Sequence, residues 1–456
     1  MEHIFREYDI RGIFGEELTE PVVKAIGYYL GKEMGKGAVF VSYDARLHSP
    51  TLFNWLISGL NWAGVEVIGG GLLPTGANYF ANFQPVKLEN GEEREVVGSI
   101  QITGSHNPPQ YNGFKITKGK KPFFGAQIGE LGKKVLNFKG KIPDNFSYLP
   151  SRLREQYINY LLSHFNNLKG MELNGVLDCG NGAVGVVLEK LLEKLQIKNY
   201  HLLYCEPDGN FPHHHPDPTE LENLQDMIGL LREGKYRYGF GFDGDGDRIV
   251  FLEGEKVYGG DELLYFFSTQ LESPHIITEV KASQGVIDAI NRRGKVEIWK
   301  TGHSNLKNRL AQTGADIAGE VSGHLFFNDR YFGVDDAIYG ALRIMELIQK
   351  GVNFSSLQKE LGEWLNTPEI KVPVPEERKF QIVEKLKDEL RSRQEELGIT
   401  RLVEVDGVRV HFPDGWGLVR ASNTTPYLTT RFEGKDAIAL ERIQTTLQKI
   451  VEELIK

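Results

Sequence analysis

The segment Thr103-Gly104-Ser105-His106-Asn107-Pro108-Pro109 places a hydroxyl beside an imidazole, and Lys115 follows a short way along the chain. A serine hydroxyl can accept and return a phosphoryl group when a base removes its proton and a cation neutralises phosphate charge. These residue types therefore suit phosphoryl transfer. Taken by itself the segment is equally well interpreted as a turn, because short motifs also arise by chance.

Three aspartates alternate with glycines in Asp243-Gly244-Asp245-Gly246-Asp247, and Arg248 follows. Glycine permits the sharp backbone turns that bring such carboxylates together. An all-carboxylate site suits a hard cation that is compatible with phosphate, and Mg²⁺ is the best match. An EF-hand is excluded, because that motif needs glycine at Arg248 and glutamate at Gly254. The pattern thus predicts a magnesium site.

Each of these segments follows an apolar run that predicts a buried strand. Residues 96–102 precede the serine segment, and residues 238–242 precede the aspartates. The Asn-Pro-Pro sequence forbids an immediate helix after Ser105. Because open α/β sheets carry their functional loops at the carboxyl ends of the strands, we expect both segments on such loops.

Alternating strands and helices divide the chain into three similar mixed α/β domains and a different C-terminal domain. The expected boundaries are residues 1–148, 151–253, 254–366 and 369–456. The last stretch has short strands adjacent in sequence between two helices, predicted at 380–397 and 437–455, which is typical of an α+β domain. Because chemical motifs fall in all four domains, we expect the domains to surround a central cleft.

The composition is that of a globular enzyme. A chain of 456 residues is too long for one core, and its net charge of −9 argues against general binding to nucleic acid or anionic membranes. Cys179 and Cys205 are the only cysteines, so we expect no disulfide framework and a reducing compartment. Because the N-terminus has no apolar signal core and no run is long enough to span a bilayer, we expect a cytoplasmic protein.

Four motifs resemble, in order, those of the α-D-phosphohexomutase superfamily, in particular bacterial phosphomannomutase/phosphoglucomutase. They are TGSHNP at 103–108 with GFK at 113–115, FDGDGDR at 242–248, GEVSGH at 319–324 and RASNTTP at 420–426. Together they span nearly the whole chain. The resemblance implies an intramolecular phosphotransferase that interconverts hexose 1-phosphate and hexose 6-phosphate, with mannose or glucose as the sugar.

The resemblance also implies how the reaction runs. Phosphorylated Ser105 gives its phosphoryl group to the sugar, the hexose 1,6-bisphosphate reorients, and its other phosphate returns to Ser105. One Mg²⁺ per chain is implied, with Ser105, Asp243, Asp245 and Asp247 as its ligands. The catalytic residues implied are Ser105, His106, Lys115, Arg11, Arg248 and His324. Lys115, Arg11 and His324 are the candidate proton carriers, and His106 is expected to support the loop.

The implied substrate-binding residues lie on several of the domains. They are Tyr8, Lys281, His303, Glu320, Ser322, His324, Arg420, Ser422, Asn423 and Thr424. Glu320 and Ser322 point the same way on an extended segment and match positions that hold sugar hydroxyls. The donors around Arg420 suit the phosphate that is not being transferred.

Alternative functions remain within the same chemistry. A phosphoglucosamine mutase and a phosphoserine-dependent sugar phosphatase would use the same groups. Gly76 stands where related proteins usually have a second proline, and Val321 stands where close relatives often have methionine, so the preferred sugar stays open. The expected partner is a small phosphosugar, with no nucleic acid and no membrane, and the chain is expected to be a monomer or a homodimer.

Overall fold

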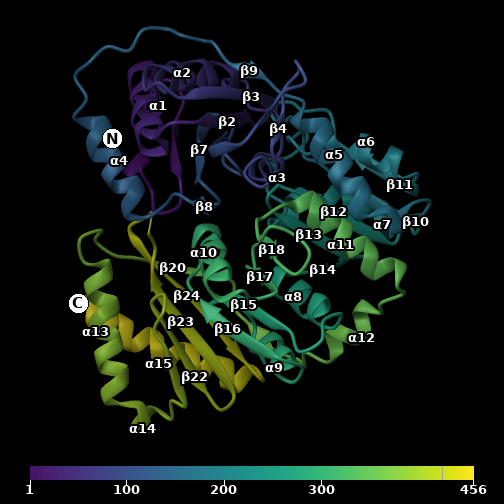
Figure 1. The fold of residues 1–456 in the computed structure, drawn as a ribbon. Coiled ribbons are helices and arrows are strands. Elements are labelled where there is room, and N and C mark those ends of the chain that lie inside the picture. Colours follow the sequence, from purple (N-terminus) through teal and green to yellow (C-terminus); the bar gives the residue numbers. More distant parts are fainter. Residues whose placement is uncertain (424) are drawn as a thin grey trace. The chain divides into compact units, whose positions relative to one another are not determined.

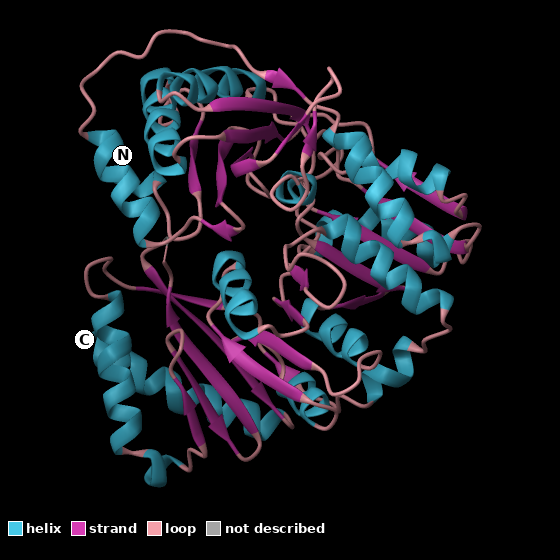
Figure 2. Ribbon diagram, viewed as in Figure 1, coloured by secondary structure: helices cyan, strands magenta, loops and turns pink. Residues whose placement is uncertain are grey.

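The computed structural model describes residues 1–423 and 425–456. The chain folds into two compact units (Figures 1 and 2). The first unit comprises residues 1–260 and 322–352, and the second comprises residues 261–321 and 353–456. Strands and helices alternate through most of the chain, which confirms the predicted multi-domain α/β fold. Three short 3₁₀ helices are η1 (Glu2–Ile4), η2 (Asn166–Leu168) and η3 (Leu221–Leu224).

The first sheet of the first unit carries the predicted serine loop. Its strand order is β1-β7-β6-β2-β3-β9, and β8 pairs with β7. The strands β6, β2 and β3 are parallel, whereas β7 is antiparallel to both β6 and β1. The strands are β1 (Ile10–Ile13), β2 (Ala38–Tyr43), β3 (Glu66–Leu72), β6 (Val96–Ile102), β7 (Tyr111–Lys118), β8 (Lys121–Pro122) and β9 (Leu149–Pro150). A small hairpin pairs β4 (Val86–Lys87) with β5 (Glu93–Arg94).

Helices α1 (Glu20–Met34) and α2 (Ser49–Trp62) pack against each other beside this sheet (Figure 1). The apolar face of α1 is in the core, because Val23, Ile26 and Leu30 are completely buried. The two backbones meet closely at Gly27, where a Cβ atom would lie 2.2 Å from the Leu56 carbonyl oxygen. Two further helices, α3 (Thr75–Phe80) and α4 (Ala126–Leu136), complete this part of the unit.

The second sheet of the first unit carries the predicted aspartate loop. Its strand order is β11-β10-β12-β13-β14, in which β10 is parallel to β11 and β12. The strands are β10 (Glu172–Asp178), β11 (Lys198–Leu203), β12 (Tyr238–Phe242), β13 (Ile249–Glu253) and β14 (Lys256–Tyr258). The helices are α5 (Leu153–His164), α6 (Gly185–Lys194) and α7 (Gln225–Arg232). Residues 322–352 add β18 (Leu325–Phe327) and α11 (Ala337–Gln349) to the unit.

Cys179 and Cys205, from which no disulfide framework was expected, form one disulfide with each other. Each cysteine lies just beyond the end of a strand, one after β10 and the other after β11. These strands are adjacent and parallel, and Asp178 is in register with Leu203, which brings the two cysteine Cα atoms to 4.9 Å. The pairing depends on strand register, which the cysteine spacing alone does not reveal.

The second unit contains a parallel and an antiparallel sheet. In the first, β15 (His275–Glu279) pairs in parallel with β16 (Lys295–Trp299) and β17 (Ile317–Gly319). In the second, the order is β19-β24-β23-β22-β21, and β20 pairs with β24. Its strands are β19 (Leu365–Asn366), β20 (Ile370–Pro373), β21 (Arg401–Val403), β22 (Val408–Phe412), β23 (Gly415–Ala421) and β24 (Tyr427–Gly434). The helices are α8 (Gly260–Ser268), α9 (Gln284–Asn291), α10 (His303–Thr313), α12 (Phe354–Lys359), α13 (Lys379–Ser392), α14 (Gln394–Leu397) and α15 (Ala437–Ile455).

Helices α13 and α15 lie side by side against the antiparallel sheet (Figure 1). Leu386 of α13 and Leu447 of α15 are completely buried with Val410 and Phe432 of the sheet. The prediction of a helix over 437–455 is confirmed by α15. The prediction of one helix over 380–397 is partly wrong, because the backbone leaves helical geometry at Arg393 and separates α13 from α14.

The division into four domains stays a prediction. In the part of the chain that the structure describes, no helix combines the length and the apolar character needed to cross a membrane.

Candidate active site

The serine loop leaves β6 at Ile102 and returns to the sheet in β7 at Tyr111. Ser105 lies at its turn, only 3% exposed, in the left-handed backbone region with φ +51°. Non-glycine residues are uncommon there, so surrounding contacts must hold the conformation. Thr103 supplies one of them, because its hydroxyl accepts a 2.7 Å hydrogen bond from the Ser105 N–H and donates to Asp44 Oδ2 at 2.8 Å.

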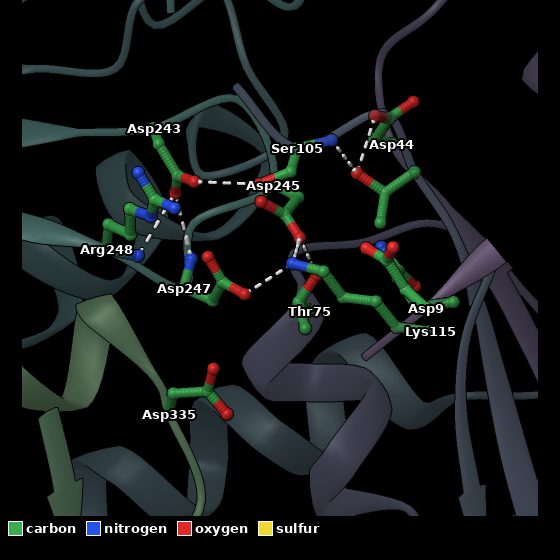
Figure 3. A network of polar contacts seen from close by, with 12 residues as sticks. Asp9, Asp44, Thr75, Ser105, Lys115, Asp243, Asp245, Asp247, Arg248 and Asp335 are labelled. Atoms are coloured by element: carbon green, nitrogen blue, oxygen red, sulfur yellow. Dashed lines mark hydrogen bonds and ion pairs between the residues drawn. The ribbon is translucent and has the colours of Figure 1, made fainter. Parts of the chain in front are cut away.

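The aspartate loop begins where β12 ends at Phe242, as predicted. The side chains of Asp243, Asp245 and Asp247 are all buried, and one oxygen of each lies within 4.8 Å of the others. The loop is closed by Asp243 Oδ1, which accepts hydrogen bonds from the N–H groups of Asp247 (3.0 Å) and Arg248 (3.1 Å). The predicted convergence of the three carboxylates is therefore present in the structure (Figure 3).

The serine and aspartate loops meet. The Ser105 hydroxyl donates to Asp243 Oδ2 at 3.3 Å (Figure 3). The backbones are equally close, because a Cβ atom on Gly244 would lie 2.5 Å from the Ser105 carbonyl oxygen. A glycine is thus required for this approach of a loop from one sheet to a loop from the other.

Lys115 of β7 supplies positive charge to the carboxylates. Its Nζ donates to Asp245 Oδ2 at 2.7 Å and also pairs with Asp247 (Figure 3). Burial by itself would lower the pKa of Lys115, but Asp245, Asp247 and Asp243 outweigh it and hold the pKa above its ordinary value. Thr75, at the start of α3, donates its hydroxyl to the same Asp245 oxygen.

The carboxylates fit a bound divalent cation. Burial, and then repulsion from Asp245 and Asp247, raises the pKa of Asp243 well above its usual range. Two buried oxygens, Asp245 Oδ1 and Asp247 Oδ1, accept no hydrogen bond from any residue in the ranges 1–423 and 425–456. Uncompensated buried oxygens are costly unless they bind a cation or a proton. Hard oxygen donors in this number suit Mg²⁺.

Arg11 and His106 flank the serine loop. Arg11 donates to the Gly104 carbonyl at 2.9 Å and to Asn107 Oδ1 at 2.6 Å, and it pairs with Asp9. The His106 Nδ1 atom lies 3.2 Å from the Ser105 hydroxyl. The charge of Arg248, followed by burial and then Arg11 and Lys115, lowers the pKa of His106 well below its usual range. His106 is therefore a neutral imidazole, able to accept or donate a hydrogen bond at the serine.

Arg248, His324 and Asp335 form a chain of hydrogen bonds. Arg248 Nε lies 2.9 Å from His324 Nε2, and His324 Nδ1 lies 3.0 Å from Asp335 Oδ2. A guanidinium N–H can only donate, so His324 Nε2 accepts and the ring proton sits on Nδ1, where it is donated to Asp335. Arg248 is thereby held in a fixed direction beside the aspartate loop.

In the second unit, carboxylates hold the predicted substrate-binding cations. Lys281 Nζ lies 2.9 Å from Glu369 Oε1, and Arg420 Nε donates to Asp406 Oδ1 at 3.1 Å. Burial would lower the pKa of Lys281, but Glu279 and Glu369 outweigh it and raise the pKa. Asp406 also accepts from the Thr301 N–H at 3.0 Å, which links the start of α10 to Arg420.

The remaining predicted substrate residues divide between the two units. Glu320 is buried in the second unit and accepts a 2.6 Å hydrogen bond from the Gly302 N–H, directly before His303. The Ser422 hydroxyl lies 2.5 Å from that of Thr425, and Asn423 is exposed. Tyr8 and Ser322, both partly buried, belong to the first unit. Thr424 lies outside the described residues.

The first unit thus brings together all the predicted catalytic and metal-binding residues. The sequence analysis missed four supporting residues. Thr75 contacts Asp245, Asp335 contacts His324, Asp44 contacts Thr103 beside Ser105, and Asp406 contacts Arg420 in the second unit. Two of the four had a visible signal, because Asp44 follows the strand at 38–43 and Asp335 lies in an Asp-Asp pair shortly after the GEVSGH motif. Thr75 and Asp406 carry no local signal.

Comparisons with known proteins indicate one family along nearly the whole chain. The models of the phosphoglucomutase/phosphomannomutase alpha/beta/alpha domains I, II and III match residues 2–131, 155–256 and 259–365, and that of the C-terminal domain matches 369–450. The chain is 39% identical to the phosphomannomutase/phosphoglucomutase of Pseudomonas aeruginosa, covering 98% of this chain and 94% of that protein. It is 37% identical to a phosphoglucomutase of Neisseria gonorrhoeae, covering 98% and 96%. A crystal structure of a phosphoglucomutase/phosphomannomutase family protein from Burkholderia thailandensis has a TM-score of 0.90 and 36% identity, covering 100% and 98%.

Proposed function

The chain belongs to the phosphoglucomutase/phosphomannomutase family and is a hexose phosphate mutase, and on that premise we propose that Ser105 carries the phosphoryl group between the two positions of the sugar. The observation that carries this proposal is the hydrogen bond from the Ser105 hydroxyl to Asp243, inside a buried cluster of three carboxylates and Lys115. The resemblance seen in the sequence and the curated relatives support the same assignment.

In the proposed reaction, a sugar hydroxyl attacks the phosphorus of phosphorylated Ser105. The new bond joins the sugar oxygen to phosphorus, and the bond from phosphorus to the serine oxygen breaks. The sugar hydroxyl loses its proton to a base, and the departing serine oxygen takes up a proton to become the Ser105 hydroxyl. The hexose 1,6-bisphosphate formed then turns in the site, and its other phosphate returns to Ser105 by the reverse steps. Added hexose 1,6-bisphosphate would accordingly serve as an activator, because it can phosphorylate Ser105.

Asp243, Asp245 and Asp247 are proposed to hold one Mg²⁺, with the phosphorylated Ser105 as a further ligand. Bound there, Mg²⁺ supplies positive charge that stabilises the transferring phosphoryl group. Arg11 and Arg248 flank the serine and would bind phosphoryl oxygens, while His106 would support the loop as a neutral partner of Ser105. The proton carrier is proposed to be one of Lys115, Arg11 and His324.

The second unit is proposed to supply most of the substrate recognition. Glu320 would hold sugar hydroxyls, and Lys281 and His303 would make further contacts with the substrate. Arg420, Ser422, Asn423 and Thr424 would bind the phosphate that is not being transferred, because they supply donors without an acid among them. From the first unit, Tyr8, Ser322 and His324 would complete the set.

Replacing Ser105 with alanine tests the proposal. We expect Ser105→Ala to abolish interconversion of hexose 1-phosphate and hexose 6-phosphate while the circular dichroism spectrum is retained. Intact mass should show one phosphoryl group on the unsubstituted protein after incubation with hexose 1,6-bisphosphate and none on the variant. Ser163→Ala, at an exposed serine of α5, serves as the matched control. Full mutase activity in Ser105→Ala would refute the assignment.

The sugar preference needs a comparison of substrates. We propose mannose and glucose phosphates as the preferred pair, with phosphoglucosamine mutase as the alternative. Parallel assays with mannose 1-phosphate, glucose 1-phosphate and glucosamine 1-phosphate decide between them. Release of free phosphate as fast as the isomerisation would instead identify a phosphoserine-dependent sugar phosphatase.

A cytoplasmic location and a monomeric or homodimeric state also remain proposals. The substrates proposed here are intermediates of carbohydrate metabolism, which supports the first. Titration of free thiols in protein isolated under anaerobic conditions would report whether Cys179 and Cys205 are paired in the cell.

A further inference from the structure

Arg46 is a buried arginine that the proposed chemistry does not use. It lies in the turn after β2, and its side chain has 0% exposure. Its guanidinium donates five hydrogen bonds. One goes to Asp44 Oδ2 at 3.1 Å, and the other four go to the carbonyls of Ser105 (3.0 Å), Asn107 (2.7 Å), Pro108 (2.6 Å) and Tyr111 (3.1 Å).

Three of these carbonyls belong to the serine loop, which has no strand or helix of its own between Ile102 and Tyr111, and the fourth, that of Tyr111, begins β7. Buried carbonyls need donors, and the two consecutive prolines in this loop have no N–H to offer. A guanidinium is the one side chain that presents five donors in a rigid fork. Arg46 therefore fixes the path of the chain from Ser105, the residue in the left-handed region, to the return into β7 at Tyr111.

Two glycines shape the space around the guanidinium. A Cβ atom on Gly104 would lie 2.3 Å from Arg46 Cζ, so the serine loop passes directly over the guanidinium. A Cβ atom on Gly209 would lie 2.8 Å from Arg46 Cα, so the 208–217 segment packs closely on the arginine backbone. Both positions exclude any larger residue without movement of Arg46.

The 208–217 segment also connects Arg46 to the aspartate loop. Its Phe211 ring covers the guanidinium, with the Cζ atom 5.2 Å from the ring centre. At the other end of the segment, the Pro216 carbonyl accepts a 3.2 Å hydrogen bond from the Gly244 N–H. One segment therefore contacts both the guanidinium that holds the serine loop and the backbone of the metal loop.

We propose that Arg46 is a positioning residue for phosphoryl transfer. It sets the distance between Ser105 and the Asp243-Asp245-Asp247 triplet by holding the serine loop and its return into β7 through four carbonyls, and Phe211 makes that hold dependent on the second sheet of the first unit. The proposal rests on the proposed role of Ser105. The side-chain donors of Arg46 contact the Ser105 carbonyl but neither the Ser105 hydroxyl nor the carboxylates of Asp243, Asp245 and Asp247, so its effect is on geometry.

Arg46→Lys is the first test, because lysine keeps the charge but cannot reproduce a planar fork that reaches four carbonyls. We expect kcat to fall about 10- to 100-fold, since small displacements of reacting groups have effects of this size. We expect KM for hexose phosphate to stay within about threefold, because the proposed recognition residues lie elsewhere. Arg343→Lys is the matched control. It alters another buried arginine of the first unit, which donates to Asp329 at 2.7 and 2.9 Å.

The proposal is supported if kcat falls in Arg46→Lys, while the Arg343→Lys control loses thermal stability but keeps its kcat. Equal kcat in the two variants overturns it. If Arg46→Lys does not fold, Phe211→Leu keeps the guanidinium and removes only its aromatic cover, and kcat should fall about two- to tenfold. Unchanged kcat in a folded Phe211→Leu protein overturns the coupling to the second sheet.

Amide hydrogen exchange separates this proposal from the proposed function. The N–H groups of Ser105 and Asn107 are bonded within the loop and should exchange faster in Arg46→Lys than in the unsubstituted protein or Arg343→Lys. This readout needs no enzymatic activity. Unchanged exchange there overturns the role of Arg46 even if Ser105 proves to be the nucleophile, whereas an inactive unsubstituted protein would refute only the proposed function.

Discussion

The charged side chains at the proposed site are buried to different extents in the two units. In the first unit Arg11, Lys115 and His324 are almost completely buried, at 6%, 3% and 3% exposure, while His106 and Arg248 are partly buried. Each of them already has an oppositely charged or hydrogen-bonding partner within the unit. In the second unit Lys281, His303 and Arg420 are only partly buried, and Asn423 is exposed.

This difference fits the two tasks proposed for the units, phosphoryl transfer in the first and substrate recognition in the second. Phosphoryl transfer is accelerated by charges that are fixed before the reaction, in a site that excludes water. Recognition of a soluble phosphosugar requires cations that can exchange their partners for the phosphate of an incoming ligand. Lys281 and Arg420 have such partners, because they pair with the carboxylates of Glu369 and Asp406. We therefore expect substitutions in the first unit to act mainly on kcat and those in the second to act mainly on KM.

Among the substitutions that test the separation between the units, Asp243→Asn is expected to have the largest effect. Asparagine can still accept the N–H groups of Asp247 and Arg248, so the loop keeps its shape while one of the three charges is lost. We expect kcat to fall about 10³-fold with little change in KM, because charge stabilisation of the transferring group is lost. Steady-state assays over a range of Mg²⁺ concentrations, after treatment with a chelator, measure the effect.

Asp388→Asn is the control for this prediction, because Asp388 is an exposed carboxylate on α13. The chelated, unsubstituted enzyme should lose activity and recover it when Mg²⁺ is added. An Asp243→Asn protein with normal kcat at low Mg²⁺ would contradict the assignment of the aspartate loop as a metal site.

Lys115→Met should lower kcat about 10²-fold, within the range for a group that carries a proton or neutralises charge. It should also destabilise the metal-free protein by about 3–5 kcal/mol, because Asp245 and Asp247 are then left buried without their partner. Adding Mg²⁺ should restore part of the lost stability. Thermal denaturation with and without Mg²⁺ measures this. A loss of stability that Mg²⁺ does not change would mean that Lys115 and the cation do not share the carboxylates.

In the first unit the sequence predicts the proposed catalytic and metal-binding side chains better than it predicts the residues that hold them in place. Ser105 and the aspartates were recognisable because each follows a buried strand, although the two strands belong to different sheets. Arg46 and Thr75 were not recognisable, because their partners are 59 and 170 residues away and nothing local marks them. The same holds for the disulfide, which depends on the register of β10 and β11.

In the second unit the motifs name the candidate substrate-binding residues, but they do not predict the carboxylates that contact them. Asp406 lies in a turn between β21 and β22, 14 residues before Arg420 in the sequence, and the antiparallel pairing of β22 with β23 brings the two together. Strand pairing of this kind is set by the whole sheet. The predicted helix 380–397 is interrupted at Arg393, where the backbone leaves helical geometry, and no residue of α14 beyond it is buried.

A smaller effect, and one of a different kind, is expected from Arg420→Gln. Glutamine cannot pair with a phosphate charge, and the loss of one charged hydrogen bond corresponds to about a 10- to 100-fold rise in KM. We expect kcat to stay within about threefold, because Arg420 is proposed to hold the phosphate that is not transferred. Arg391→Gln, at an exposed arginine paired with Glu404, is the control. A fall in kcat with unchanged KM would contradict the separation of tasks between the units.

The smallest effect is expected from Asp406→Asn, and it should have the opposite sign. The amide oxygen can still accept the Thr301 N–H, but it no longer competes with a phosphate for Arg420. We expect KM to fall about two- to fivefold at low salt, the range measured for weak ion pairs, and the difference should shrink as salt screens the charges. Initial rates at several salt concentrations, with Asp388→Asn as the control, measure it. If kcat changes instead of KM, Asp406 supports the chemistry rather than the availability of Arg420, and the second unit does more than recognise the substrate.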